Sequence, residues 1–377
     1  MRCLHLFSDW KWTGPAEPVV SLCEELARQG LDVTLAYRKT PLDEFPERTV
    51  GKEVERRRVK GFEGFRLSRY FSLKDWLFDF RTLGGYVRQQ RIDIVHTHLS
   101  HDHSTAVVSL LFRGDAPLVI RTDHKRDGLE KNWTMARLFA RTDGVAAYAE
   151  RIRQADIHNF RYPEERTVML PPGLRMYSGP TADLRKDLGI EPDEKVVGVI
   201  GRLKPDRGYD VILKGFKLLR EHVAKVKLVI VGRSSQIEES IKKPLAALGL
   251  EKDVILAGYR TDDYFSMIST FDLFLMMRAG SDGTARALRE VMGMGRPAIV
   301  SDRGMLPELV KDGVSGYVVS DEHKLADRMA RVLSDEGLRA RLGEAARKIA
   351  VEEWNYETQA KKLINFYEKI LAMGKRK

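Results

Sequence analysis

Two acidic residues, Asp282 and Glu290, have the types and spacing that point most directly to chemistry. Asp282 lies in the glycine turn Gly280–Thr284, and Glu290 lies about two turns into the helix predicted to follow it. Such a turn presents unpaired backbone N–H groups, and the helix start adds the positive end of its dipole, so an anion is favoured there. Acids on either side of the anion could accept hydrogen bonds from hydroxyl groups. A phosphate flanked by hydroxyl-bearing sugars is what a nucleotide-sugar contains. The alternative is an ordinary helix capped by Ser281 or Asp282.

Histidines form a second group, beyond the ends of two predicted strands. His96, His98, His101 and His103 follow one strand, and His124 follows the next strand along the chain. Alternating histidines would allow two or three of them to bind zinc. Histidines at strand ends are more often hydrogen-bonded structural groups, so the pattern alone leaves both interpretations open.

The elements that must position these residues form two similar halves. The first half is predicted to have strands at 2–7, 31–37, 92–96, 118–121 and 144–148, and the second at 195–200, 226–231, 254–257, 273–277, 298–301 and 316–319. Helical stretches separate the strands, which predicts parallel sheets covered on both faces. Ligands of such sheets bind beyond the carboxyl ends of the strands, where the acids and histidines above are expected.

We therefore predict an α/β protein of two doubly wound, Rossmann-like domains facing a central cleft. The predicted parts are a first domain at 1–172, a linker at 173–184, a second domain at 185–357, and a C-terminal helix at 358–377 that packs back on the first domain. The length of 377 residues is too great for one ordinary core and suits two.

Composition predicts a folded, soluble, cytoplasmic protein. The chain is 43% hydrophobic, and no uninterrupted apolar run in it approaches the roughly 18 residues of a membrane span. The N-terminal segment lacks a signal-peptide pattern and is predicted to be the first strand. Cys3 and Cys23 lie in apolar segments without metal-ligand spacing, so we expect both in the core and no transition-metal site.

The chain carries a net charge of +10, and a dense basic stretch lies at 48–69 in its first half. Its basic residues there include Arg48, Lys52, Arg56, Arg57, Arg58, Lys60, Arg66 and Arg69. An aromatic and aliphatic segment, 70–80, follows directly, and this combination is typical of a protein that rests on an anionic membrane surface. The alternative is a solvated basic loop followed by a core helix. Nucleic-acid binding is not expected, because no helix-turn-helix, zinc or RNA-binding motif accompanies the charge.

Four segments in order resemble the retaining glycosyltransferases of family 4, which have the two-domain GT-B fold. The segments are VIGRLKPDRGYDVILKGFKLL at 199–219, LVIVGRS at 228–234, VILAGYRTDD at 254–263, and the stretch 281–319 that contains Asp282 and Glu290. The resemblance covers nearly the whole chain and is much stronger after residue 195.

The resemblance implies a role for each charged position. Arg202 and Arg207 match two basic positions that contact the donor diphosphate, where they could stabilise its developing charge without a divalent metal. The family usually has lysine at the second position. Glu290 matches the glutamate that binds the ribose hydroxyls. Asp282 stands where the family usually has a glutamate facing the donor sugar, so the role of this shorter acid and the identity of the sugar are open.

The resemblance also implies which backbone groups surround the donor. The expected residues are Gly201 and Gly232 in the nucleotide-side loops, Gly258, Tyr259 and Arg260 near the base, and Gly283, Thr284 and Ala285 around the sugar and diphosphate. In the first domain, His124 of Arg121–His124 matches a histidine beside the reacting sugar. His98 matches a preceding strand-end histidine on the acceptor side, and Gly14 matches a glycine loop that approaches the diphosphate.

The expected function is a retaining, metal-independent transfer of a sugar from a nucleotide-sugar to a glycan or lipid-linked acceptor. The basic and aromatic stretch favours a cell-envelope or lipopolysaccharide glycan, made at the inner face of the cytoplasmic membrane. Two alternatives stay open: a sugar-nucleotide epimerase on the same fold, and a weakly catalytic, nucleotide-sugar-binding scaffold.

Overall fold

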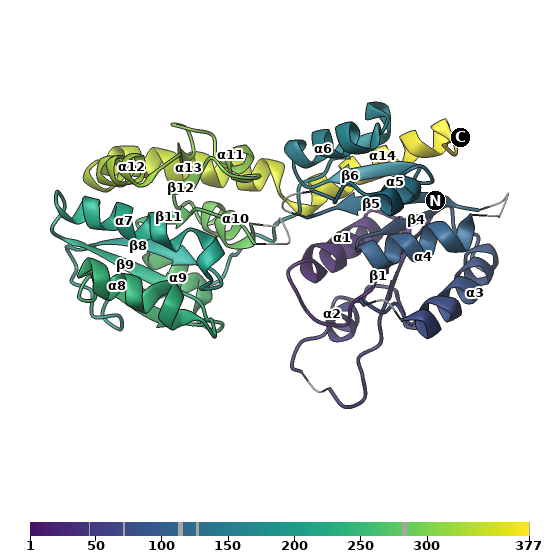
Figure 1. The fold of residues 1–377 in the computed structure, drawn as a ribbon, viewed down its shortest axis with the longest axis horizontal. Coiled ribbons are helices and arrows are strands. Elements are labelled where there is room, and N and C mark those ends of the chain that lie inside the picture. Colours follow the sequence, from purple (N-terminus) through teal and green to yellow (C-terminus); the bar gives the residue numbers. More distant parts are fainter. Residues whose placement is uncertain (45, 71, 112–115, 126–127, 281–284, 377) are drawn as a thin grey trace. The chain divides into compact units, whose positions relative to one another are not determined.

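The computed structural model divides the chain into two compact units, each built on one parallel sheet (Figure 1). It describes residues 1–377 except 45, 71, 112–115, 126–127, 281–284 and 377. The first unit comprises Met1–Gly173 and the C-terminal segment from Tyr356. The described residues of the second unit run from Leu174 to Asn355.

The first unit contains a seven-stranded sheet with the order β3-β2-β1-β4-β5-β6-β7. Its strands are β1 (Arg2–Phe7), β2 (Asp32–Tyr37), β3 (Gly61–Phe62), β4 (Ile94–Thr97), β5 (Leu118–Asp123), β6 (Gly144–Ala147) and β7 (Thr167–Met169). Its helices are α1 (Ala16–Arg28), α2 (Val50–Arg56), α3 (Leu73–Gln89), α4 (Ser100–Leu110), α5 (Trp133–Phe139), α6 (Glu150–Phe160) and α14 (Tyr356–Met373), with a 3₁₀ turn at Glu164–Arg166. The described strand pairs in this sheet are parallel.

Alternation along β1 divides the core of this unit into two layers. Cys3 and Phe7 pack with side chains of α1 and α14, whereas Leu4 and Leu6 pack with side chains of α3 and α4. Because successive strand residues point to opposite faces, His5 lies on the same side as Cys3 and therefore faces α14. Burial raises the pKa of the Cys3 thiol to about 12, as expected of an inert core cysteine.

The second unit contains a six-stranded sheet with the order β10-β9-β8-β11-β12-β13. Its strands are β8 (Lys195–Ile200), β9 (Val226–Val231), β10 (Val254–Gly258), β11 (Leu273–Met276), β12 (Ala298–Ser301) and β13 (Gly316–Val319). Its helices are α7 (Tyr209–Arg220), α8 (Lys243–Leu248), α9 (Tyr264–Thr270), α10 (Arg286–Gly293), α11 (Leu306–Leu309), α12 (Glu322–Ser334) and α13 (Glu336–Glu353), with a 3₁₀ turn at Pro205–Arg207 and a π-helical turn at Glu238–Lys242. Apolar side chains of α7, α8 and α12 form one core layer against this sheet.

Strand order reverses once in each sheet, beside β1 in the first unit and beside β8 in the second. β1 pairs with β2 and β4, and β8 pairs with β9 and β11. A crevice opens at such a point, outside the carboxyl ends of the strands, and holds the ligands of doubly wound sheets. The loops after these strands are therefore the first places to look for a site.

The α/β fold and its longer strands are confirmed, with shifts of a residue or two at their ends. The edge strands β3 and β7 went unpredicted because each has only two or three residues and one pairing neighbour. The helical stretch after Asp321 divides into α12, α13 and α14, and α14 packs beside α1 in the first unit. Within the described residues, no helix is both long and apolar enough to cross a membrane.

Candidate functional site

Three glycine loops meet at the carboxyl edge of the second sheet. The Gly201 N–H donates to the Val231 carbonyl at 3.0 Å, and the Gly232 N–H donates to the Gly258 carbonyl at 2.8 Å. Gly232 has a φ of 153°, and a Cβ there would lie 1.9 Å from the Gly201 carbonyl oxygen. Only glycine allows so close an approach. The predicted residues Gly201, Gly232 and Gly258 therefore line one continuous edge.

The loop after β8 carries both predicted arginines. Arg202 is exposed, whereas the Arg207 side chain is only 14% exposed. The Arg207 guanidinium donates to the carbonyl of Ala279, which lies in the loop after β11. Its Nε lies 3.7 Å from the half-exposed carboxylate of Asp206. Arg207 is thus held against the segment that leads to α10, and its positive charge is only partly balanced.

The loops after β9 and β10 place an aromatic ring and two more arginines on the same edge. Tyr259 is 60% exposed, and the guanidinium of Arg233 lies 4.5 Å from the centre of its ring. Arg260 donates to the Ala257 carbonyl at 2.9 Å and pairs with Asp263 at 2.8 Å. An exposed ring braced by a cation is suited to stack on a flat base. Arg233 was missed, although it directly follows the glycine of a motif that the sequence highlighted.

Helix α10 begins without a side-chain cap. Its N-cap is Ala285, which is buried and adopts a left-handed conformation with φ 43° and ψ 40°. The alternative interpretation, an ordinary helix capped by Ser281 or Asp282, is therefore wrong, because the N-cap is Ala285 and the helix begins at Arg286. Ala285 has no side chain that could accept a hydrogen bond from the first N–H groups of α10. The predicted residues Asp282, Gly283 and Thr284 lie outside the described residues.

Glu290 is a buried carboxylate inside α10, with a side chain only 6% exposed. Its Oε2 accepts a hydrogen bond from the Tyr264 hydroxyl at 2.6 Å, and its Oε1 accepts one from Arg286 Nε at 2.8 Å. The pairing with Arg286 joins residues four positions apart on one helix face, which is a common structural contact. Tyr264 adds a partner from α9, and burial, followed by the nearby Glu290 charge, raises the pKa of its phenol. A carboxylate fixed from two sides is well suited to orient hydroxyl donors.

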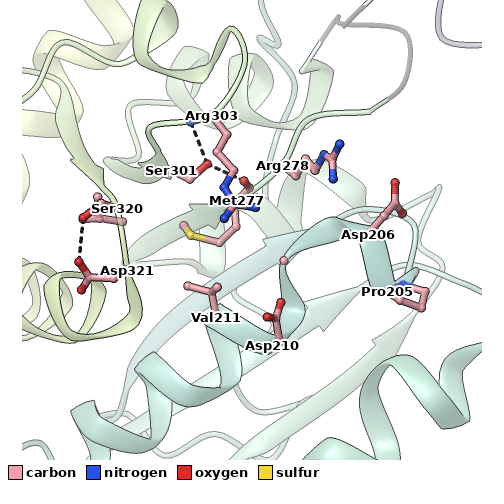
Figure 2. A pocket seen from close by; sticks show the side chains of 12 residues that line it. Pro205, Asp206, Asp210, Val211, Met277, Arg278, Ser301, Arg303, Ser320 and Asp321 are labelled. Atoms are coloured by element: carbon pink, nitrogen blue, oxygen red, sulfur yellow. Dashed lines mark hydrogen bonds between the residues drawn. The ribbon is translucent and has the colours of Figure 1, made fainter. Parts of the chain in front are cut away.

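A cavity of about 230 Å³ opens at the same edge (Figure 2). The residues that line it are Pro205, Asp206, Gly208, Asp210, Val211, Met277, Arg278, Ser301, Arg303, Val319, Ser320 and Asp321. These residues follow β8, β11, β12 and β13 or begin α7. The Ser301 hydroxyl donates to the Met277 carbonyl at 2.6 Å and closes the cavity floor. The sequence did not single out Arg278 or Arg303, although each lies within two residues of a strand end.

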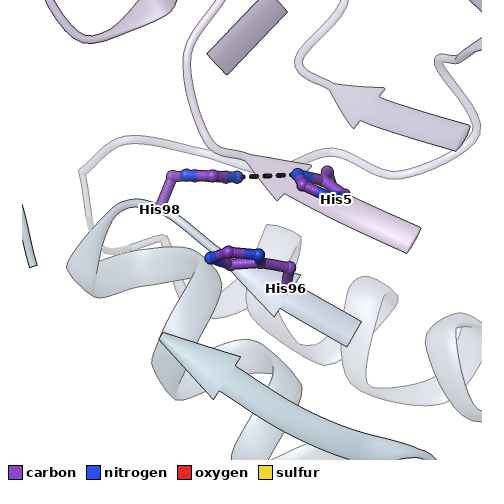
Figure 3. A group of neighbouring side chains, drawn as sticks. All are labelled: His5, His96 and His98. Atoms are coloured by element: carbon purple, nitrogen blue, oxygen red, sulfur yellow. Dashed lines mark hydrogen bonds between the residues drawn. The ribbon is translucent and has the colours of Figure 1, made fainter. Parts of the chain in front are cut away.

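In the first unit, the predicted histidines separate into two groups. His96 and His98 meet His5 of β1 in a fully buried cluster (Figure 3). His101 and His103 lie in α4, where His103 Nε2 bonds the Thr142 hydroxyl at 2.7 Å. The metal-like run of four histidines therefore does not form one site. His5 was missed because its partners come from a different strand.

His124 and His98 are brought together as predicted neighbours at the strand ends. His124 Nε2 lies 2.6 Å from the His98 carbonyl oxygen, so the ring donates through Nε2. Both side chains are buried. Beneath them lies a group of buried charges, Arg121, Asp123 and Asp156. Burial, followed by the nearby charge of Asp123, raises the pKa of Asp156 to about 8.

The loop after β1 is fixed by a carboxylate that the sequence did not reveal. Asp102 of α4 accepts hydrogen bonds from the N–H groups of Ser8 at 2.7 Å, Leu99 at 2.7 Å and His98 at 3.1 Å. The Ser8 hydroxyl also donates to it. Asp102 thus ties the loop after β1 to the loop after β4. Gly14 lies farther along, in a turn where the Ala16 N–H donates to the Thr13 carbonyl at 3.0 Å.

The basic stretch of the first unit is partly neutralised. Glu53 is buried in α2 and pairs with Arg48 at 3.0 Å, Arg56 at 2.6 Å and Arg57 at 3.2 Å. Burial alone would raise the pKa of Glu53, but hydrogen bonds from Arg56 and Arg48 outweigh it and lower the pKa to about 2. Three of the eight predicted basic residues, Arg48, Arg56 and Arg57, therefore pair with one buried carboxylate.

The following helix, α3, combines a core face with an exposed apolar face. Leu83 and Val87 are buried. Leu73 is 58% exposed and Phe78 is 37% exposed. Trp76 is only part-exposed and stacks on Phe80 with ring centres 5.6 Å apart. Helix α3 therefore packs on the core, as the second interpretation expects, and also presents apolar side chains outward, while membrane contact stays a prediction.

Two family models match the chain, one for each half. The model described as Glycosyltransferase Family 4 matches residues 13–176. The model described as Glycosyl transferases group 1 matches residues 180–349. The two matches do not overlap, and together they cover nearly all elements of both sheets.

Individual relatives agree with the family models. The chain is 28% identical over 193 residues to the lipopolysaccharide 1,2-N-acetylglucosaminetransferase of Salmonella typhimurium, a match that covers 48% of this chain and 50% of the relative. The chain spans about half the length of this relative, and about half the length of two other curated relatives. It is 24% identical to the D-inositol 3-phosphate glycosyltransferase of Corynebacterium glutamicum over 94% of this chain and 91% of the relative.

Solved structures match the whole fold. The structure of Anabaena HepE in complex with UDP superposes with a TM-score of 0.79 at 17% identity, covering 98% of this chain and 100% of that chain. At this identity the match establishes the fold, that of a GT-B glycosyltransferase.

Proposed function

The chain belongs to the family-4-type glycosyltransferases of the GT-B fold, and on this premise we propose that it transfers a sugar, with retention, from a nucleotide-sugar to a glycan or lipid-linked acceptor. The observation that carries the proposal is the contact of Arg207 with Ala279. It holds a guanidinium against the loop that leads to the uncapped start of α10. A cation beside the start of a helix, where the positive end of the helix dipole lies, is suited to a diphosphate.

In this proposal Arg207 and Arg202 stabilise the leaving nucleoside diphosphate. Negative charge develops on the β-phosphate as its bond to the sugar breaks, and preorganised donors aimed at that charge lower the barrier. Arg207 is preorganised, because its guanidinium is nearly buried and already bonded to Ala279. The two guanidiniums take the part that a divalent metal plays in metal-dependent transferases, so we propose a metal-independent reaction.

The nucleoside is proposed to lie along the glycine edge. The Tyr264-braced carboxylate of Glu290 would accept hydrogen bonds from the ribose hydroxyls. Tyr259, supported by Arg233, would stack on the base, with Arg260 beside it. Because Anabaena HepE was solved with UDP, a uridine diphosphate sugar is the first donor to test.

The chemical step is proposed to take place on one face of the sugar. The bond from the anomeric carbon to the diphosphate oxygen breaks, and the acceptor oxygen forms the new bond on the same side. The acceptor proton passes to the departing phosphate oxygen, so atoms and charge balance without another reagent. His124 and Asp282 would contact the donor sugar, and Gly14 would approach the diphosphate.

A panel of nucleotide-sugars tests the proposal. A ligand at 100 times its dissociation constant adds about 2.7 kcal/mol to the free energy of unfolding, which a thermal-shift assay detects. The stabilising donor is then incubated with and without candidate acceptors, and released nucleoside diphosphate is measured. Acceptor-dependent release with an α-linked product from an α-linked donor supports the proposal. An isomerised donor without acceptor indicates an epimerase, and tight binding without turnover indicates a scaffold.

The acceptor is proposed to be membrane-associated, as in cell-envelope or lipopolysaccharide synthesis, and reached from the inner membrane face. The support is the outward side of α3, where Leu73, Leu77 and Phe78 are exposed beside Lys74 and Arg81. Apolar side chains flanked by cations suit an anionic lipid surface. The relation to a lipopolysaccharide transferase agrees with this choice of acceptor.

A further inference from the structure

Five buried side chains from four elements form one continuous hydrogen-bonded chain beneath the strand ends of the first unit. His98 Nε2 lies 3.0 Å from His5 Nδ1, and His5 Nε2 lies 3.1 Å from the Tyr367 hydroxyl. The same hydroxyl bonds His96 Nδ1, and His96 Nε2 lies 2.6 Å from the Thr122 hydroxyl. Tyr367 comes from α14, so residues almost a full chain length apart share this contact.

The ring arrangement favours hydrogen bonding over a shared metal ion. Zinc needs one ring nitrogen of each histidine aimed at a single point about 2 Å away. The His96 and His98 rings are stacked instead, with centres 4.6 Å apart and planes at 13°, so their in-plane lone pairs run side by side (Figure 3). Both His96 nitrogens already face hydroxyls, those of Tyr367 and Thr122.

Where the Tyr367 hydroxyl donates one of its two hydrogen bonds and accepts the other, the hydrogen-bonded chain has two possible directions. A neutral histidine donates through one nitrogen and accepts through the other, and a tyrosine hydroxyl donates once. The donation by one member therefore fixes the donation by the next. In one direction His98, His5 and His96 all carry their proton on Nε2, and in the other direction all three carry it on Nδ1. Burial lowers the pKa of all three rings, which keeps them neutral as this counting requires.

His98, at one end of this hydrogen-bonded series of side chains, decides which way the hydrogen bonds run. His98 Nδ1 is buried and has no hydrogen-bond partner among the residues that the structure describes. A buried N–H group is left unpaired more rarely than an acceptor. His98 therefore carries its ring proton on Nε2, and its Nδ1 is unprotonated. At the other end, the Thr122 hydroxyl can rotate to suit either direction.

We propose that Tyr367 is a positioning residue of the transfer site, which it reaches through His5 and His98. It locks His98 in the Nε2–H form, and His98 in turn holds His124 through its carbonyl oxygen at 2.6 Å. The proposal rests on the proposed function only in that His124 contacts the donor sugar. In this proposal, helix α14 helps to position the residues that follow β4 and β5.

The first test needs no activity. Two-bond ¹⁵N–¹H spectra of histidine-labelled wild-type protein report which ring nitrogen carries each proton. We expect His5, His96 and His98 all to be protonated on Nε2. A mixture of forms among the three overturns the proposal, as does stoichiometric zinc that metal analysis finds in the purified protein and that a His5→Ala variant lacks.

The second test uses Tyr367→Phe, which removes the hydroxyl and keeps the ring. His5 and His96 lose their common partner, so we expect His5 and His98 to show mixed forms and kcat to fall about three- to tenfold with KM for the donor unchanged. Tyr162→Phe is the matched control, because Tyr162 is equally buried in the same unit and its hydroxyl donates to the Thr142 carbonyl at 2.8 Å. An unchanged kcat in Tyr367→Phe, or an equal loss in Tyr162→Phe, overturns the positioning role.

The two proposals fail separately. If no nucleotide-sugar is turned over, the proposed function fails, and the wild-type spectra still decide the direction of the chain. If transfer occurs and the spectra show mixed forms, the proposed function stands and the role of Tyr367 is rejected. Should Tyr367→Phe not fold, the wild-type spectra remain the deciding measurement.

Discussion

Replacing Glu290 by glutamine tests the assignment of the ribose site with the smallest change in shape. The carboxylate accepts from Tyr264 at 2.6 Å and from Arg286 at 2.8 Å, and its side chain is 6% exposed. A glutamine amide keeps one acceptor oxygen and turns the other position into a donor. One of the two existing donors then faces an N–H group, and a ribose hydroxyl meets a neutral group instead of a charged one.

The expected loss of affinity follows from the difference between charged and neutral hydrogen bonds. A hydrogen bond to a charged group contributes about 1.5–3 kcal/mol, and a neutral one about 0.5–1.5 kcal/mol. The difference of roughly 1.4 kcal/mol is about a tenfold change in Kd. We therefore expect Glu290→Gln to bind the matching nucleoside diphosphate about tenfold more weakly than the wild type.

Calorimetric titration with two ligands locates the effect on the ribose. The wild type and the Glu290→Gln variant are titrated with the nucleoside diphosphate and with its 2′,3′-dideoxy analogue. If Glu290 binds the ribose hydroxyls, the variant loses affinity for the first ligand and not for the second. Equal losses for both ligands would refute the reasoning, because the carboxylate would then act only through the fold. Tyr264→Phe keeps the carboxylate and serves as the control, with an expected change in Kd below about threefold.

Three further predictions concern turnover, pH and the membrane. Arg202→Ala and Arg207→Ala should each lower kcat about 10²-fold, whereas Arg207→Lys keeps the charge and should lose less, as initial rates at saturating donor will show. Because burial raises the pKa of Asp156 to about 8, its stabilising contribution is present at acid pH and is lost as the pH rises through 8. Wild-type stability should therefore fall from about pH 4 to about pH 8 and level off above it, by at most about 1.4 kcal/mol per pH unit from this group, and urea unfolding of Asp156→Asn should show a flatter profile. Leu77→Ser with Phe78→Ser should reduce co-sedimentation with anionic vesicles and leave transfer to a soluble acceptor unchanged; equal sedimentation of variant and wild type would contradict the α3 surface.

The fold was predictable from local patterns because both sheets are built from parallel strands with buried runs on either side. Lys195–Ile200 and Val226–Val231, for example, were predicted with the ends that the structure shows. The edge strands β3 and β7 were not predicted, because a strand of two or three residues is too short to show an alternation of apolar and polar residues. Motif order then indicated the sheet edge of the second unit, where Gly201, Gly232 and Gly258 do meet.

The parts of the site that escaped prediction depend on contacts between distant segments. Asp102 looks like an ordinary first-turn helix acid, and only the fold shows that it collects donors from the loops after β1 and β4. His5 looks like one polar residue in a buried strand, and its significance comes from His98 and Tyr367, 93 and 362 positions away. Local periodicity carries no information about such pairs, because they are created by the order of strands in the sheet.

The start of α10 distinguishes between the two interpretations of this segment, an anion-binding turn and an ordinary capped helix. A side-chain cap at Ser281 or Asp282 would have used the N–H groups that an anion needs, and the structure begins the helix at Arg286 behind a left-handed Ala285. A left-handed alanine costs on the order of 1–2 kcal/mol, and a missing cap costs about 1 kcal/mol more. Such costs persist where the surrounding structure imposes them, and they are typical of ligand sites. The left-handed Ala285 therefore agrees with the ligand chemistry predicted for this segment better than an ordinary capped helix would have done, because the start of α10 then presents the positive end of its dipole to a diphosphate.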